Sequence, residues 1–300
     1  MGHFPLSRVF DLASLRARHA AESRAGPEPG PRQLGRARSL CVVSGKGGTG
    51  KSVVSASLAR LFARAGPCLL VDADLGVGNA HILQGVTPRA TIADLFGGRA
   101  PAKLLEPCAP GLDLFAGGSG VARLASISYS DLARLGDALD LLERRYAYLV
   151  ADCGAGISEA TLAFARAADR VVVVTTPDLT AVTDAYAFLK VLGLPPSGPV
   201  PALVVNRAPD ERTARDTAER VAAVARRFLG RAPDVLGWLP DDPDVTLSVN
   251  QRTPLVERLP MGPAARALLG LGEQLRGQLD GLHPRGLGRH LANLKAAVRA

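Results

Sequence analysis

The stretch Ser39–Ser52, SLCVVSGKGGTGKS, decides the fold. It opens with a short apolar run, Leu40–Val43, and continues into a glycine-rich turn that matches the phosphate-loop pattern G-x-x-x-x-G-K-[ST]. The fixed positions are Gly45, Gly50, Lys51 and Ser52. Apolar residues after the turn recur at helical spacing. The turn therefore lies between a predicted strand and a predicted helix, which is the context that separates a phosphate loop from a chance glycine-rich turn.

This turn has the chemistry needed to hold a polyphosphate. Glycines let the backbone wrap an anion with its N–H groups pointing inward, and the following helix adds the positive end of its dipole. Lys51 is predicted to reach the β- and γ-phosphates, and the Ser52 hydroxyl is predicted to ligate Mg²⁺. The residues predicted to bind nucleotide here are Gly45, Lys46, Gly47, Gly48, Thr49, Gly50, Lys51, Ser52 and Val53.

Acidic residues follow two further apolar runs. The run Pro67–Val71 leads into Asp72 and Asp74, whose spacing of two points both carboxylates the same way on a strand. The run YLVAD ends in Asp152, the arrangement of a Walker B acid that binds Mg²⁺ through water. Such acids also occur as plain turn formers or helix caps, but the phosphate loop upstream favours a metal site. The predicted metal set is Ser52, Asp72, Asp74 and Asp152.

Length and amino-acid composition limit which class of protein the chain can belong to. The chain has 300 residues, 47% of them hydrophobic, which is enough for one sizeable α/β domain with extensions. Its 36 Lys and Arg against 28 Asp and Glu give a formal charge of +8, consistent with a solvated surface or with attraction to an anionic membrane or nucleic acid. The 4 cysteines form no C-x-x-C pair, which argues against zinc or iron–sulfur sites built from close pairs.

The fold class predicted is α/β, a doubly wound and mostly parallel sheet, because apolar runs alternate with helical patterns from Ser39 to about Pro260. We expect residues 1–38 to be an N-terminal helix and linker, 39–262 the nucleotide-binding domain, and 263–300 C-terminal helices. No signal-peptide pattern occurs, and no apolar run reaches about 18 residues, so we expect a cytoplasmic protein. The expected strands are Leu40–Val43, Pro67–Val71, Ala109–Gly120, Tyr148–Asp152, Arg170–Thr176, Leu203–Asn206 and Val235–Leu239.

Three of these motifs resemble those of one ATPase family. The second lysine of the loop, Lys46, resembles the signature lysine of the deviant Walker A loop in MinD/ParA ATPases. DADLGVGN at 72–79 resembles the switch I of that family, and CGAGIS at 153–158 resembles its switch II. The resemblance implies an ATP-dependent homodimer in which Lys46 reaches the partner's nucleotide and Asp74 orients the attacking water. The catalytic set it implies is Lys46, Lys51, Asp74 and Asp152.

The resemblance extends to the nucleotide base. Asn206 and Arg207 lie where relatives place a base-contacting asparagine, and Pro240, Asp241 and Asp242 resemble the loop that holds adenine. No N-K-x-D motif occurs, which argues against a GTPase. The implied ligands are ATP or ADP with Mg²⁺.

Two segments outside these motifs favour the flagellar-number branch of the family. DLASLR at Asp11–Arg16 resembles the D-Q-A-x-x-L-R element that stimulates the GTPase FlhF, with Leu12 where glutamine is usual. TAVTDAY at 180–186 resembles the same branch. This implies regulation of flagellar number, placement and assembly, with an FlhF-type partner.

Other functions remain open at this level. The alternatives are a ParA-type partition ATPase that binds DNA and a MinD-type ATPase of the cell-division site. An iron–sulfur carrier is disfavoured by the cysteine spacing, and an inactive scaffold by the presence of every expected catalytic residue.

The C-terminal segment has a basic amphipathic pattern. Its apolar positions are Leu287, Leu291, Leu294 and Val298, with basic residues around them. Such a helix either lies on an anionic membrane surface, as in MinD-like proteins, or packs on its own domain.

Overall fold

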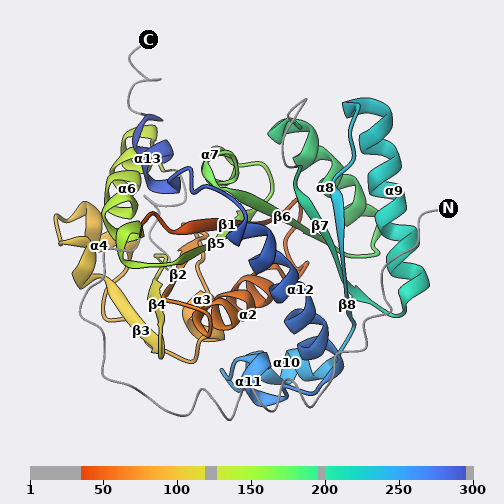
Figure 1. The fold of residues 1–300 in the computed structure, drawn as a ribbon, viewed down its shortest axis with the longest axis horizontal. Helices are drawn as coiled ribbons and strands as arrows, with labels where there is room; N and C mark the ends of the chain where they lie inside the picture. The colour runs from red at the N-terminus through yellow and green to blue at the C-terminus, as the bar shows by residue number, and fades with distance from the viewer. Residues whose placement is uncertain (1–34, 119–126, 195–199, 295–300) are drawn as a thin grey trace. The chain divides into compact units, whose positions relative to one another are not determined.

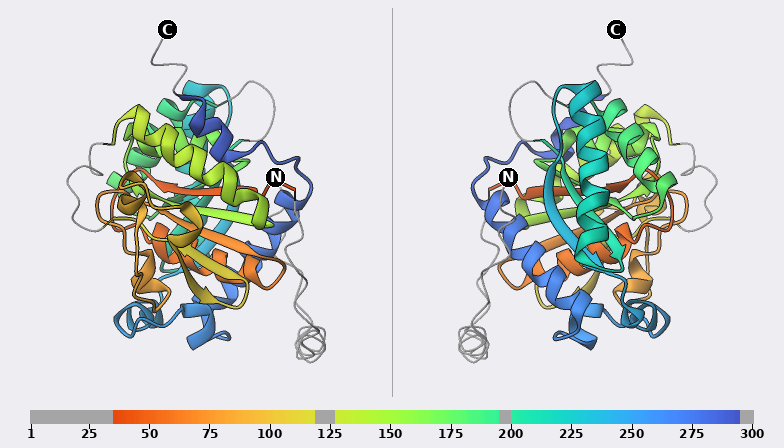
Figure 2. Two further views of the ribbon diagram at one scale, coloured as in Figure 1. Left: turned by 90° about the vertical axis from the view of Figure 1, so that its left-hand side faces the viewer. Right: turned by 90° about the vertical axis from the view of Figure 1, so that its right-hand side faces the viewer.

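The computed structural model describes residues 35–118, 127–194 and 200–294 (Figures 1 and 2). The chain divides after Arg32, and Gln33–Ala300 form one compact unit. The predicted activator element Asp11–Arg16 lies outside the described residues, as does Val298.

Within the described residues the core is an eight-stranded sheet of order β3-β4-β2-β5-β1-β6-β7-β8. All neighbouring strands are parallel except the β3–β4 pair. The predicted α/β fold with a mostly parallel, doubly wound sheet is therefore confirmed. The strands are β1 (Arg38–Ser44), β2 (Cys68–Ala73), β3 (Leu105–Ala109), β4 (Leu112–Phe115), β5 (Tyr148–Ala155), β6 (Arg170–Thr175), β7 (Ala202–Ala208) and β8 (Asp234–Pro240).

The central strands are apolar on both faces because helices cover both. In β1, Leu40 and Val42 belong to one buried cluster, and Cys41 and Val43 belong to the other. All four side chains are fully buried, which explains the uninterrupted apolar run that marks this strand in the sequence.

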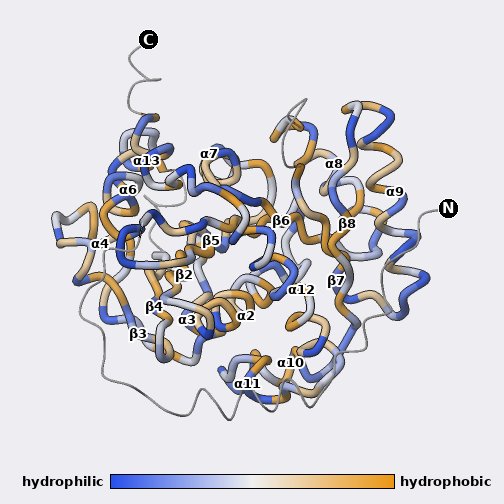
Figure 3. Tube along the Cα trace, viewed as in Figure 1, coloured by the Kyte–Doolittle hydropathy of each residue, from blue (hydrophilic) through white to orange (hydrophobic). Residues whose placement is uncertain are grey.

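Helices form a layer on each side of the sheet. Residues of α2, α11 and α12 pack in the cluster on one face, and those of α4, α6, α7, α8, α9 and α13 pack on the other. Figure 3 shows the matching hydropathy pattern, with α9 alternating between polar and apolar residues. The helices are α2 (Lys51–Ala63), α3 (Ala80–Leu83), α4 (Ile92–Phe96), α6 (Tyr129–Leu142), α7 (Glu159–Ala167), α8 (Leu179–Leu192), α9 (Glu211–Leu229), α10 (Pro243–Asn250), α11 (Leu255–Arg258), α12 (Pro263–Asp280) and α13 (Leu287–Ala292), with 3₁₀ turns η1 (Pro101–Lys103) and η2 (Glu143–Arg145).

One predicted strand is wrong at its start. The expected strand Ala109–Gly120 begins in a hairpin, because Pro110 and Gly111 turn the chain between β3 and β4, and Gly111 has a φ of 75°. Strand β3 itself was not predicted. It is a half-exposed edge strand interrupted by Pro107, so its sequence has no clear alternation.

The C-terminal helices pack on the domain. Helix α12 contributes Leu268, Leu275 and other residues to the same buried cluster as α2. In α13, Leu287 and Leu291 are buried in the cluster that contains α6, so the structure supports packing of this apolar face on its own domain. No helix among the described residues has the length and apolar character required to cross a bilayer.

Close backbone contact joins α13 to α6. A Cβ added to Gly136 would lie 2.3 Å from the Ala292 nitrogen, and one added to Gly288 would lie 2.2 Å from the Asp140 nitrogen. Glu143, at the end of α6, is fully buried and accepts a hydrogen bond from the Gly288 N–H. Glycine at both crossing points therefore lets the two helices pack at backbone distance.

Glu143 makes the stability of this packing depend on pH. Burial raises the pKa of Glu143 to about 7, although the Gly288 N–H and Arg36 favour its charged form. The folded protein therefore keeps the carboxyl proton of Glu143 at pH values where the unfolded chain has already released it. The free energy of unfolding that this difference contributes is lost as the pH rises from about 4.5 to about 7. Relative to Glu143→Gln, the native protein should lose up to about 3 kcal/mol of unfolding free energy between pH 4.5 and 7.5. Urea unfolding at both pH values checks this; parallel pH dependences in the two proteins would contradict it.

Candidate functional site

The glycine-rich loop joins the carboxyl end of β1 to the first turn of α2. Gly48 and Gly50 have φ values of 79° and 86°, a backbone region that favours glycine. A Cβ on Gly45 would lie 2.2 Å from the carbonyl group of Asp184, so the start of the loop is pressed against the backbone of α8. The loop sits at the amino end of a 13-residue helix, the position in which backbone N–H groups bind phosphate.

Asn206 fastens this loop to β7. Its Nδ2 donates to the Thr49 carbonyl oxygen at 2.7 Å, and its Oδ1 accepts from the Arg207 N–H at 2.9 Å. A Cβ on Gly50 would lie 2.2 Å from the same Nδ2 atom. Asn206 was predicted to contact the base, and the structure shows that its amide positions the phosphate loop.

The predicted acids lie on adjacent strands beneath the loop. Asp72 of β2 and Asp152 of β5 are partners in the strand register. Asp74, just beyond β2, lies with Oδ2 3.7 Å from the Lys51 Nζ atom. Its other oxygen accepts from the Val77 N–H, and the Gly154 backbone passes close to it. The structure thus brings Lys51, Asp72, Asp74 and Asp152 together, and their roles in catalysis and metal binding stay predictions.

Asp72 also holds the chain that follows it. Its Oδ2 accepts the Ala80 N–H at 3.0 Å, and its Oδ1 accepts the Asp74 N–H at 3.3 Å. A Cβ on Gly78 or Gly117 would come within about 3 Å of Asp72, so both glycines are needed for close packing around it. Asp72 therefore shapes the segment 74–80; its place in a metal shell stays a prediction.

Burial dominates the electrostatics of the two strand acids. It raises the pKa of Asp72 to about 8, and the negative charge of Asp152 adds to the shift. Burial also raises the pKa of Asp152, against the effect of the Lys51 ammonium group. Asp74 adds a third carboxyl group beside the same lysine.

These residues fit a magnesium ion. Asp152 Oδ1 is a buried oxygen to which the described residues offer no hydrogen bond, and Ser52 lies at the first turn of α2 beside it. No cluster of three or more His, Cys, Asp or Glu side chains in the described part could chelate a metal alone. Mg²⁺ is commonly held by one or two protein oxygens, with phosphate oxygens and water completing its shell, and Ser52 and Asp152 would provide such oxygens.

A pocket of about 280 Å³ adjoins the loop on the β7–β8 side. It is lined by Gly50 and Val53 and by the predicted base-binding residues Asn206, Arg207, Pro240, Asp241 and Asp242. Asp242 has a structural task as well, because its carboxylate accepts the N–H groups of Asp244 and Ala264. The pocket is continuous with the loop, as a nucleotide base attached to a bound phosphate requires.

Lys46 links the loop to the start of α8. Its side chain is exposed, and its Nζ donates to the Thr180 Oγ1 atom at 2.7 Å. Lys51, by contrast, lies beside Asp74.

A family model described as the CobQ/CobB/MinD/ParA nucleotide binding domain matches residues 40–255, the segment that builds this site. The chain belongs to this family. Its members include P-loop ATPases of the MinD and ParA type, so the chain is a nucleotide-binding ATPase of the MinD/ParA family.

Similar proteins support the assignment. The antiactivator FleN of Pseudomonas aeruginosa is 31% identical over 249 residues, covering 82% of this chain and 89% of FleN. The flagellum site-determining protein YlxH of Helicobacter pylori is 36% identical over 195 residues, covering 64% of this chain and 65% of YlxH. The septum site-determining protein MinD of Pyrococcus horikoshii, solved with Mg-ADP, superposes with a TM-score of 0.66 over 82% of this chain and all of that chain, at 21% identity.

Two features of this MinD/ParA site were not predicted. The first is the hydrogen bond from Lys46 to Thr180. Thr180 lies in the TAVTDAY run, but nothing in that run indicates which of its side chains contacts the loop. The contact of Gly117 with Asp72 depends on the pairing of β2 with β4, which sequence patterns do not specify.

Asp152→Asn tests the metal site. Burial disfavours the charged form of Asp152, and its Oδ1 has no hydrogen-bond partner among the described residues, so a neutral amide there should raise the melting temperature without ligand by at least about 2 °C. In the presence of ADP, adding Mg²⁺ should raise the melting temperature of the variant less than that of the native protein. Thermal melts with and without Mg²⁺ measure both effects, and Asp216→Asn on the exposed face of α9 is the control. Equal Mg²⁺ responses in Asp152→Asn and native protein would contradict the site.

Proposed function

We propose that the chain hydrolyses ATP to ADP and phosphate with Mg²⁺, in a homodimer that forms on ATP binding, and that this cycle regulates the number, placement and assembly of flagella. The position of Lys46 is the main observation that supports the proposed dimer. Lys51 already supplies the ammonium group of its own site, whereas Lys46 is exposed and donates to Thr180 at the start of α8. On exchanging this one hydrogen bond, Lys46 would act on the nucleotide of a second chain.

Exposed apolar residues around the same face support association. Val77 follows β2 and is 63% exposed, Ile157 follows β5 and is 51% exposed, and Leu179 at the start of α8 is 72% exposed. Each lies within a few residues of Asp74, Asp152 or Thr180. Large apolar side chains at the rim of a site favour a partner surface over contact with water.

The chain's residues then have distinct roles in hydrolysis. Backbone N–H groups of the loop and Lys51 hold the phosphates, and Ser52, Asp152 and Asp72 are the candidates to hold Mg²⁺ directly or through water. Bound Mg²⁺ would neutralise charge on the transferring phosphoryl group. Asp74, beside Lys51 and Gly154, orients the attacking water, and Lys46 from the partner stabilises the developing charge.

The flagellar part of the proposal rests on the similarity to YlxH, whose printed name describes a flagellar role, and on the resemblance of TAVTDAY to the flagellar branch. By the resemblance of Asp11–Arg16, we propose an FlhF-type GTPase as the partner. We place the protein in the cytoplasm, with a peripheral state at the inner membrane face. Attachment through the C-terminal segment requires a state in which α13 has left α6, since Leu287 and Leu291 are otherwise buried.

Lys46→Ala tests the dimer. The variant should bind ATP with an affinity close to that of the native protein, because Lys51 and the loop backbone are intact, but it should stay monomeric with ATP. Light scattering after size-exclusion chromatography measures the mass, and Lys103→Ala, an exposed lysine outside the site, is the control. Native-like dimers of Lys46→Ala with ATP would rule out its action on a second chain.

Lys51→Ala tests the biological role. Introduced at the chromosomal locus of the source organism, it should abolish nucleotide binding and change the number or position of flagella counted by electron microscopy. Lys103→Ala should leave both as they are. An unchanged flagellar pattern in the Lys51→Ala strain would reject the flagellar assignment and favour a role in partition or division.

A further inference from the structure

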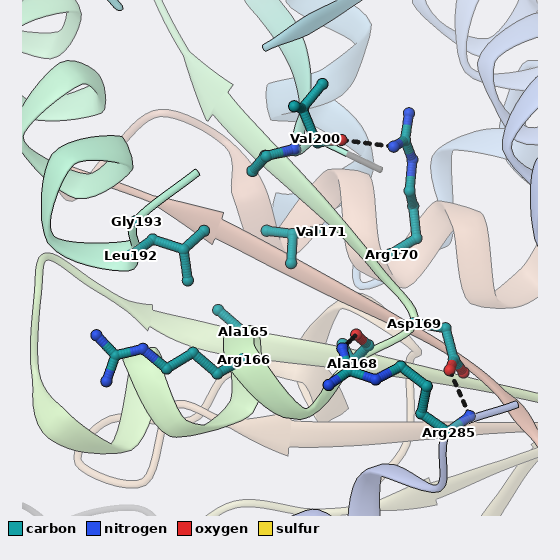
Figure 4. Close-up of a pocket in the computed structure, with 11 residues that line it drawn as sticks. Ala165, Arg166, Ala168, Asp169, Arg170, Val171, Leu192, Gly193, Val200 and Arg285 are labelled. Atoms are coloured by element: carbon teal, nitrogen blue, oxygen red, sulfur yellow. Dashed lines mark hydrogen bonds between the residues drawn. The ribbon is translucent and has the colours of Figure 1, made fainter. Parts of the chain in front are cut away.

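A second pocket, of about 190 Å³, lies at the end of the sheet away from the nucleotide loop. It is formed where β6 begins, where α7 and α8 end, and where the chain enters β7. Figure 4 shows arginines around an apolar floor, with Val171, Leu192 and Val200 between them. The arginines are Arg166, Arg170 and Arg285.

The Arg170 side chain is engaged by contacts within the protein. Its side chain is only 6% exposed, and its guanidinium donates to the Val200 carbonyl, to Asp234 Oδ2 at 2.8 Å and to Gln278 Oε1 at 3.2 Å. Because an ion pair balances its charge, Arg170 builds the wall of the pocket and does not provide free positive charge.

The carboxylate of Asp169, which lines the pocket, also makes hydrogen bonds within the protein. One oxygen accepts the backbone N–H and the hydroxyl of Ser39, each at 2.7 Å, and the other accepts the backbone N–H of Arg285 at 2.7 Å. Both of its oxygens are therefore engaged by hydrogen bonds from inside the protein, and the hydrogen bond from Arg285 comes from the main chain.

Within the described ranges, Arg285 and Arg166 use few of their guanidinium donors. The Arg285 guanidinium donates to the Ala168 carbonyl at 3.4 Å, and that of Arg166 donates to the Val191 carbonyl at 2.9 Å. Among the described residues neither forms an ion pair with a carboxylate. Both side chains are exposed and line the pocket, so two guanidinium groups flank its apolar floor.

The size and polarity of the pocket define what it can hold. A cavity of about 150 Å³ takes up a benzene molecule, so this one has room for an apolar body of that size. Guanidinium groups bind carboxylate and phosphate through paired N–H donors. We propose that the pocket binds a small organic oxyanion, a carboxylate or phosphate carried on a body of about one ring. The oxyanion contacts Arg285, the body lies along Val171 and Leu192, and Arg166 adds the second charge.

The test uses the full chain saturated with ADP and Mg²⁺, so that the phosphate loop is already filled. Calorimetric titrations with benzoate and phenyl phosphate compare the two oxyanions on the same ring. Benzyl alcohol provides the ring without charge, and inorganic phosphate provides the charge without a ring. We expect saturable binding of benzoate or phenyl phosphate at least about tenfold tighter than that of either control, and the tighter of the two identifies the headgroup.

Variants locate the binding. Arg285→Gln should weaken it about tenfold and Arg166→Gln less, while Arg266→Gln on the exposed face of α12 should have no effect. Arg285→Gln keeps its backbone bond to Asp169, and an unchanged melting temperature confirms its fold. The proposal is overturned if neither ring anion saturates, if benzyl alcohol or inorganic phosphate binds as tightly, or if Arg285→Gln binds like the native protein.

Discussion

The structure around the nucleotide loop depends on one balance of charge. Asp72 and Asp152 are buried side by side on β2 and β5, and Lys51 is the cation closest to them in the loop. Burial raises the pKa of both acids, so a bound cation would favour their charged forms. Phosphate oxygens would in turn meet the N–H groups and Lys51 above the acids. We therefore propose that the same residues bind both a polyphosphate and a divalent cation.

Close packing ties this site to its surroundings. Gly45 rests on the backbone of α8, and Gly50 rests on the amide of Asn206 from β7. The start of α8 carries Thr180, which holds Lys46, and the exposed Leu179. The phosphate loop thus contacts the helix whose start belongs to the surface that we propose to meet a second chain.

Much of this could be predicted from the sequence, because the determining signals are local. The loop at Gly45–Ser52 has a fixed spacing, and the acids after β2 and β5 follow uninterrupted apolar runs. Carboxyl ends of parallel strands meet at one edge, which is why Asp72, Asp74 and Asp152 could be placed together before their distances were known.

The remaining features depend on contacts between distant segments. The role of Asn206 follows from its reach to Thr49, and the edge strand β3 carries no alternation that would mark it. The C-terminal sequence pattern fits a helix on a membrane surface as well as a helix packed on its own domain. The packing depends on Gly136 and Gly288, where α6 and α13 approach at backbone distance, and the sequence does not indicate that these two glycines meet. The arginine pocket likewise forms only when α7, β6, α8 and the chain before α13 come together.

The most direct measurement mixes two inactive proteins, Lys46→Ala and Asp74→Ala, and follows phosphate release from ATP. In a mixed dimer, the Lys46→Ala subunit keeps its own Asp74 and receives Lys46 from its partner, so one site is complete. If Lys46 acts across the dimer, a Lys46→Ala subunit can pair with an Asp74→Ala subunit, which keeps its Lys46. Mixing should then restore phosphate release that neither protein shows alone, at most about half of the native value per mixed dimer because each has one working site. If Lys46 acts within its own chain, the mixture will stay as inactive as its components, and the central claim will be wrong.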